Sequence, residues 1–170
     1  MGLLSVNLHK ETMAVLMNAV GDFATSKHMS EQAVANILYG IARLGVKRHN
    51  LSLPMQEKLF TCISKVGPRM TPQAVSNSIY ALSQIGFQWQ DLCSNTRSSL
   101  ISAIIRQHGH FNQQGLSMTL FSLGRMNVVN SIQCTNRHGN IDHNNDSDDG
   151  TRCSNDEGEL FLPLLVDTLV

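Results

Sequence analysis

Residues 29–46 read MSEQAVANILYGIARLGV, and this pattern returns as MTPQAVSNSIYALSQIGF at 70–87 and as FNQQGLSMTLFSLGRMNV at 111–128. The three copies start 41 residues apart and match without gaps. A fixed period of this length is typical of stacked supersecondary units rather than of one globular core. The sequence therefore predicts an all-α fold, a right-handed α-solenoid of helical hairpins with a 41-residue repeat.

Each copy begins and ends with residue types that favour helix termini. Ser30, Thr71 and Asn112 carry side-chain oxygens that accept hydrogen bonds from a first helical turn, and Pro72 suits the first helical position. At the other end stand Gly45, Gly86 and Asn127, which tolerate the left-handed conformation that closes a helix. We expect second helices over roughly 54–66 and 96–107, which end before Gly67-Pro68 and His108-Gly109.

The repeats divide the chain into four segments. Residues 1–28 are interpreted as a partial preceding repeat whose second helix is Glu11–Phe23, and residues 29–130 hold the repeats that start at 29, 70 and 111. Residues 131–158 are polar and acidic, and they are predicted to be a disordered insertion. Residues 159–170 return to an apolar helical pattern and are interpreted as the displaced second helix of the third unit. Further repeats or a protein partner would have to cover this helix, so the chain resembles a fragment or a truncated repeat array.

The net charge of zero hides a basic body and an acidic tail. Residues 1–130 contain 11 Lys and Arg against 5 Asp and Glu, whereas residues 131–170 contain 2 against 8. The body therefore carries about six positive charges and suits an anionic partner, and the acidic tail could compete with that partner for the basic surface. Four widely spaced cysteines indicate neither a disulfide framework nor a zinc site. No apolar run is long enough to cross a membrane, and no targeting segment is visible.

A polar stripe follows the first helix of each unit. At 100° per residue, Val34, Ile37, Leu38, Ile41 and Leu44 share the face opposite Gln32 and form the predicted buried side. The stripe on the other side consists of Gln32, Asn36 and Arg43, then Gln73, Asn77 and Gln84, then Gln114, Met118 and Arg125. Amide and guanidinium groups in such a ladder match RNA base edges and phosphates. The alternative is an ordinary solvated helix face, although solvent does not require Gln each time.

An aromatic residue borders each stripe, namely Tyr39, Tyr80 and Phe121. These rings either stack on RNA bases or lie buried between neighbouring units, and the sequence leaves both alternatives open. Six cations near helix ends or on second helices are either phosphate contacts or solubilising charges: Lys47, Arg48, Lys65, Arg69, Arg97 and Arg106.

Residue clusters with catalytic or metal-binding chemistry are not evident. We find no phosphate-binding loop, dinucleotide fingerprint, metalloprotease helix or nucleophile elbow, so no enzyme activity and no cofactor are expected. Cys134, His138, His143 and Cys153 fit no standard zinc spacing, and residues 145–156 match a calcium loop poorly. No metal site is expected.

The segments QAVANILYGIARLG (32–45) and QAVSNSIYALSQIG (73–86) resemble the core helix of octotricopeptide-type repeats, whose pattern is close to PQ-L-N-LWAL-K-LG. Such repeats are also found beside RAP domains in organellar RNA-processing and translation factors. The resemblance covers residues 29–128, with tyrosine or phenylalanine at the usual tryptophan position, and the third unit departs from it at Met118 and Asn127. No RAP domain is visible in this chain.

The resemblance implies sequence-selective binding of single-stranded RNA in the mitochondrion or chloroplast, in RNA processing, stability or translation, with no chemistry by the repeats. The alternative function is an armadillo-like or HEAT-like scaffold that binds a protein in the same groove. Salt dependence separates the two, because each phosphate contact releases counterions.

Overall fold

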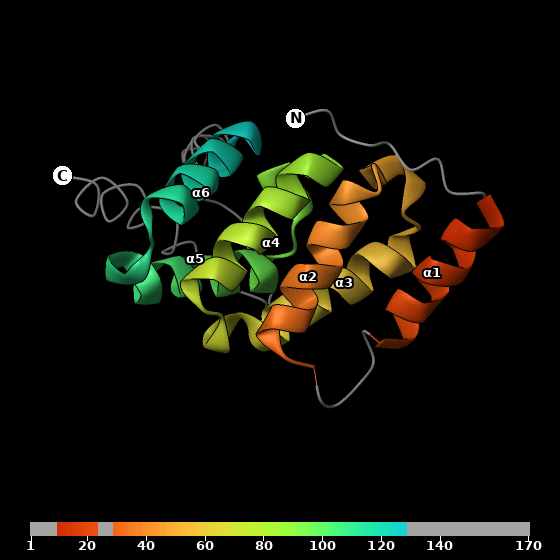
Figure 1. Cartoon of the computed structure of the whole chain (residues 1–170), viewed down its shortest axis with the longest axis horizontal. Coiled ribbons are helices and arrows are strands. Elements are labelled where there is room, and N and C mark those ends of the chain that lie inside the picture. The colour runs from red at the N-terminus through yellow and green to blue at the C-terminus, as the bar shows by residue number, and fades with distance from the viewer. Residues whose placement is uncertain (1–9, 24–28, 129–170) are drawn as a thin grey trace, which may run out of the picture.

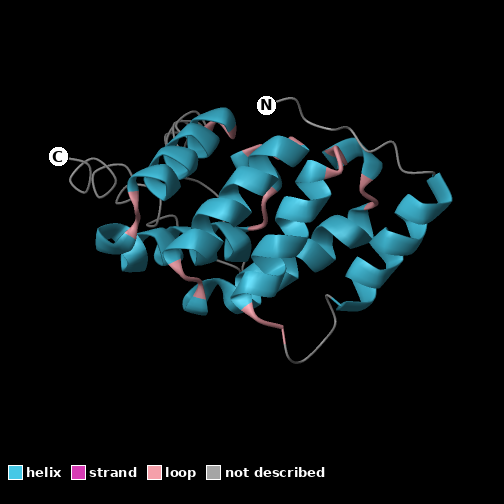
Figure 2. Ribbon diagram, viewed as in Figure 1, coloured by secondary structure: helices cyan, strands magenta, loops and turns pink. Residues whose placement is uncertain are grey.

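The structure, a computed structural model, describes residues 10–23 and 29–128, and this part of the chain is all-helical and contains no strand (Figure 1, Figure 2). Its six α-helices are α1 (Lys10–Phe23), α2 (Glu31–Arg43), α3 (Leu53–Val66), α4 (Pro72–Ile85), α5 (Ser94–Gln107) and α6 (Gln113–Arg125). The proposed acidic insertion, the apolar segment 159–170 and the four metal-capable residues Cys134, His138, His143 and Cys153 lie outside the described residues. None of the described helices is long and apolar enough to cross a membrane.

The capping residues expected from the sequence begin α2, α4 and α6. The Ser30 hydroxyl accepts a hydrogen bond from the Ala33 N–H at 3.2 Å, and the Thr71 hydroxyl accepts one from the Ala74 N–H at 3.3 Å. Asn112 Oδ1 accepts the third, from the Gly115 N–H at 2.7 Å. These three contacts confirm the predicted N-caps, each of which satisfies a backbone donor that the helix itself leaves free.

The same three helices are followed by residues in the left-handed conformation. The φ angles are 75° at Gly45, 99° at Gly86 and 56° at Asn127. Asparagine is the side chain that best tolerates this region after glycine, and Asn127 Nδ2 is also held by Gln88 Oε1 at 2.6 Å. The predicted helix ends are therefore confirmed.

The second helices end where expected and begin slightly earlier than expected. α3 starts at Leu53 and α5 at Ser94, one and two residues before the predicted positions. Four short 3₁₀ helices, not predicted from the sequence, complete the connections: η1 (Arg48–Asn50), η2 (Gly67–Arg69), η3 (Trp89–Asp91) and η4 (His108–His110). Each of η2 and η4 continues directly from an α-helix, a frequent use of the tighter 3₁₀ turn.

The α-helices form two rows. In Figure 1, α2, α4 and α6 lie side by side, with α4 packed against both neighbours. α3 and α5 pack together behind them, and each also contacts the first-row helix that lies beside it in sequence. α1 lies against the outer side of α3, where Gly21 faces the side chains of Met55 and Lys58.

The core lies between the two rows. Leu38 of α2, Ile63 of α3, Ile79 of α4 and Leu100 of α5 are fully buried. Burying one such side chain contributes about 2 kcal/mol to the free energy of folding. The expected buried side of α2 is confirmed for Val34, Leu38 and Ile41, whereas Ile37 and Leu44 are half-buried at the edge of this core.

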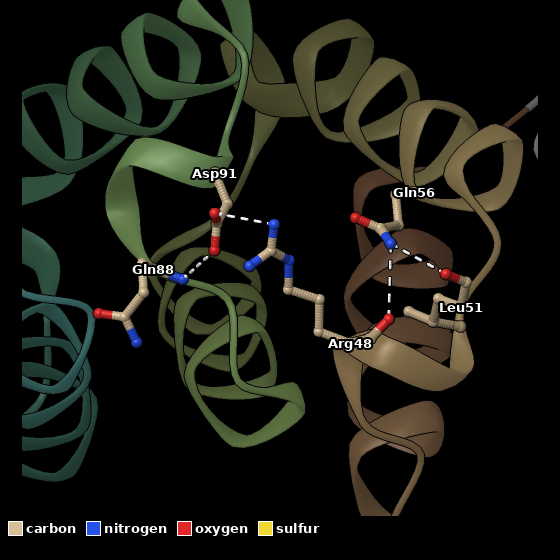
Figure 3. A network of polar contacts seen from close by, with 5 residues as sticks. All are labelled: Arg48, Leu51, Gln56, Gln88 and Asp91. Atoms are coloured by element: carbon tan, nitrogen blue, oxygen red, sulfur yellow. Dashed lines mark hydrogen bonds and ion pairs between the residues drawn. The ribbon is translucent and has the colours of Figure 1, made fainter.

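Polar contacts join neighbouring helix pairs outside the core. In Figure 3, the Arg48 guanidinium lies 2.9 Å from Asp91 Oδ1, and the second oxygen of that carboxylate accepts the Gln88 N–H at 2.8 Å. On the other side, Gln56 Nε2 donates to the carbonyl oxygens of Arg48 and Leu51. This network links η1 to η3 and fixes the connection that precedes α3.

Candidate nucleic-acid interface

The exposed side of α2, α4 and α6 carries four rows of residues, which we call the first-helix face. Because the three helices begin at caps 41 residues apart and lie side by side, residues at matching positions come into line across them. From the N-terminal to the C-terminal end, the rows are Gln32, Gln73 and Gln114; Asn36, Asn77 and Met118; Tyr39, Tyr80 and Phe121; and Arg43, Gln84 and Arg125.

A groove with a volume of about 580 Å³ crosses the N-terminal halves of the three helices. Six residues of the predicted RNA-binding set line it: Gln32, Asn36, Gln73, Asn77, Gln114 and Met118. The structure therefore brings the first two rows together in one depression. Glu31 stands in its lining on α2, and His110 contributes to it from η4.

Small buried residues make room for this groove. Ala35, Ala74 and Ser76 are each at most 3% exposed, and they line the groove together with Gly115. The Ser76 hydroxyl donates to the Gly115 carbonyl at 3.1 Å, so α4 and α6 approach closely at this point. A β-carbon at Gly115 would lie 3.0 Å from that hydroxyl, which leaves little space for any side chain.

The amide groups of the groove are free to bind a ligand. Gln32, Asn36, Gln73 and Gln114 are exposed, and Asn77 is half-buried. Across residues 10–23 and 29–128, no hydrogen bond involves any of these five side chains. Each amide offers a donor and an acceptor side by side, which is the pattern needed to pair with the edge of a base.

The last row of the first-helix face lies outside the groove. Arg43, Gln84 and Arg125 stand near the C-terminal ends of their helices and do not line it. Arg43 and Arg125 are exposed, and among the described residues neither forms an ion pair. The face is thus divided into neutral amides at one end and two guanidinium groups at the other.

The aromatic row lies between these two ends. The rings of Tyr39 and Tyr80 are 6.3 Å apart between centroids and tilted by 33°. Tyr39 is 37% exposed and Phe121 61% exposed, while Tyr80 is half-buried between its neighbours. Complete burial between helices, one of the two alternatives for this row, does not occur for Tyr39 or Phe121.

Several of the cations considered as phosphate contacts or solubilising charges form hydrogen bonds or an ion pair between helix pairs. Arg106 Nη2 donates to the carbonyl oxygens of Gly67 and Met70, both at 3.0 Å. Lys47 Nζ donates to the Gln84 carbonyl at 2.9 Å, and Arg69 Nη2 reaches the Met29 carbonyl at 3.3 Å. With the Arg48–Asp91 ion pair, these contacts give four of the six cations an internal role.

Other groove residues were not singled out from the sequence. Ala35 and Ser76 lie at matching positions 41 residues apart, and their shared small size was the available signal. For His110 the available signal was a basic residue type at the matching positions, which hold His28 and Arg69. Within the described residues, no group of three or more His, Cys, Asp or Glu side chains is placed to hold a metal ion.

Comparisons of this chain with protein-family models, with curated proteins and with solved structures find no match.

Proposed function

We propose that this chain binds single-stranded RNA across the first-helix face and performs no chemistry of its own. In this proposal the helix pairs are units of a right-handed α-solenoid with the 41-residue repeat of the sequence. By the resemblance to octotricopeptide-type repeats, the function belongs to RNA processing, stability or translation in the mitochondrion or chloroplast.

The observation that carries the proposal is the set of five unpaired amide side chains in one groove that crosses three helices. Bases would enter the groove and pair with these amides, because a glutamine or asparagine can both donate to and accept from a base edge. The exposed rings of Tyr39 and Phe121 lie next to the groove rows and offer faces on which bases stack.

The phosphates would follow the guanidinium groups of Arg43 and Arg125. Both side chains are exposed and unpaired among the described residues, in contrast to the four cations with internal contacts. Residues 1–130 carry an excess of six positive charges, which favours binding of an anionic partner such as RNA. A peptide-binding scaffold would more often have an acidic or apolar groove.

Fluorescence anisotropy of the full chain with pooled single-stranded RNA, at low and at physiological salt, tests the proposal. The triple variant Gln32→Ala/Gln73→Ala/Gln114→Ala removes the first row. If each glutamine loses one hydrogen bond worth roughly 1 kcal/mol, about 100-fold weaker binding is expected. The matched control is Gln90→Ala/Gln113→Ala, which changes two exposed glutamines outside the groove lining and leaves the affinity unchanged.

If a folded sample does not bind RNA at low salt, the RNA proposal is wrong, and the armadillo-like or HEAT-like scaffold becomes the favoured function. Equal losses in both variants would show that the groove amides have no special role.

A further inference from the structure

The side of α6 that corresponds to the buried side of α2 and α4 is not covered by a second-row helix among the described residues. Val34 and Leu38 on α2 are at most 3% exposed, and their counterparts on α4, Val75 and Ile79, are fully buried. The residues at the same positions on α6, Leu116 and Leu120, are only half-buried. α3 and α5 lie behind α2 and α4, and the described residues include no further helix in the corresponding place behind α6.

The outer side of α5 is open in the same way. The corresponding side of α3 is covered by α5. There, Thr96 Oγ1 of α5 donates to the Phe60 carbonyl at 3.1 Å and lies 2.9 Å from the Ser64 hydroxyl. The matching positions on α5 are Ile101, which is half-buried, and Ile105, which is 39% exposed. We call Ile101, Ile105, Leu116 and Leu120 the α5–α6 edge.

We propose that residues 159–170 of the same chain dock as a helix on the α5–α6 edge. This inference extends beyond RNA binding and stands without it, because it rests on burial alone. The segment contains eight apolar residues in twelve: Leu160, Phe161, Leu162, Leu164, Leu165, Val166, Leu169 and Val170. Leu162, Leu165, Val166 and Leu169 follow the spacing i, i+3, i+4, i+7 and share one side of a helix, as an edge-covering helix requires.

The sequence near the start of this segment resembles the start of α3, which packs against α2 in the same way as the proposed helix would pack against α6. Leu162-Pro163-Leu164 parallels Leu53-Pro54-Met55, which begins α3 with proline in its first turn. The intervening residues 131–158 contain almost no large apolar side chains and cannot cover four aliphatic residues.

The linkage favours the same chain over a second copy. The described part ends at Val128, immediately after α6, and 30 residues separate it from residue 159. A random-coil linker of that length has an end-to-end distance of about 30 Å, and such tethers give effective concentrations near the millimolar range. A second copy at micromolar concentration competes poorly with a tethered segment.

Hydrogen exchange of the full chain, followed by mass spectrometry at about 5 and 100 μM, tests the docking. We expect the amides of 160–170 to exchange at least about tenfold more slowly than in an unstructured peptide, at both concentrations. Ile105→Glu on the edge and Leu165→Glu on the segment should each remove that protection. The control Leu53→Glu changes a residue that is 73% exposed on α3 and should keep it.

Random-coil exchange of 160–170 in the unaltered chain overturns the proposal. Protection that appears only at the higher concentration, together with a doubled mass in sedimentation, overturns it in favour of a second copy. Leu165→Glu lies outside the body of the protein, so its result stands even if Ile105→Glu unfolds α5. Unchanged exchange of the α5 amides in Ile105→Glu would exclude such unfolding.

Discussion

Gly67 lies at the C-terminal end of α3, where α5 passes too close for a side chain. A β-carbon there would overlap the Ser99 hydroxyl and lie 3.0 Å from Ser99 Cβ and 3.2 Å from its carbonyl oxygen. We predict that Gly67→Ala lowers the free energy of unfolding by about 1–3 kcal/mol, because the two helices must move apart. Urea unfolding followed by circular dichroism measures the change.

Gly124 provides the matched control for this substitution. It lies in the last turn of α6, and a β-carbon there meets nothing within 4 Å. Gly124→Ala should leave stability unchanged or raise it by about 0.5–1 kcal/mol, since alanine loses less backbone entropy in a helix. A loss at Gly124 as large as that at Gly67 would contradict the steric explanation.

Cys62 and Cys93 should differ in reactivity because only one is buried. Burial raises the pKa of the Cys62 thiol above its ordinary value, and the nearby Lys65 ammonium opposes this shift only in part. Cys93 is exposed. Since the thiolate is the reactive form, iodoacetamide at pH 8 should alkylate Cys93 at least about tenfold faster than Cys62.

Peptide mass spectrometry separates these two cysteines from Cys134 and Cys153. In denaturant, Cys62 should be alkylated at the same rate as Cys93. This control shows that the two thiols have the same intrinsic reactivity once the protein is unfolded. Equal rates in the native protein would show that α3 is not packed as described.

At the scale of the helix, stability depends on single capping groups. The Thr71 hydroxyl accepts the Ala74 N–H, and the first turn of α4 has no other side-chain cap. We predict that Thr71→Ala lowers the free energy of unfolding by about 1 kcal/mol, whereas Thr71→Ser, which keeps the acceptor, changes it little. Chemical denaturation of both variants gives the comparison, and equal losses would point to the methyl group instead of the cap.

The sequence predicts the ends of the α-helices well because the signals are local. A capping oxygen or a left-handed glycine acts within its own turn, so Ser30 and Gly86 could be assigned without knowledge of the fold. η1 and η3 also carry a local signal, since Asn50 and Asp91, 41 residues apart, each accept the backbone N–H three residues earlier. The Arg48–Asp91 pair, in contrast, joins distant segments. Such a contact leaves no local pattern to detect.

The candidate site was predictable only in part for the same reason. Helical periodicity placed the glutamines and asparagines on one face, and all of them except Gln84 line one groove. It could not show that α4 packs beside α2 and buries Ala35, which is 1% exposed although it lies close to Gln32 on the helix. Nor could it separate Arg43, which is exposed and unpaired among the described residues, from Arg106, which binds two carbonyl oxygens.

Over the whole molecule, the cations fall into two groups. Lys47, Arg48, Arg69 and Arg106 each contact a residue at least 36 positions away, so they join successive helix pairs. Arg43 and Arg125 have no such contact among the described residues and stand on the first-helix face. In the proposed function, the two free arginines would contact the phosphates of RNA, while the other four cations stabilise the fold.

This division predicts different salt dependences for two double variants that lose the same charge. If Arg43 and Arg125 each contact one phosphate, Arg43→Ala/Arg125→Ala should reduce the slope of log affinity against log salt by about 1.4, at about 0.7 per phosphate on single-stranded RNA. Arg48→Ala/Arg106→Ala should lower the midpoint of unfolding and leave that slope nearly unchanged, provided that binding is measured where circular dichroism shows a folded protein. Anisotropy titrations at four salt concentrations give both slopes. Equal reductions in the two variants would mean that RNA responds to the overall field of the basic body, whereas a change confined to the first pair would place the phosphates along the C-terminal row of the first-helix face.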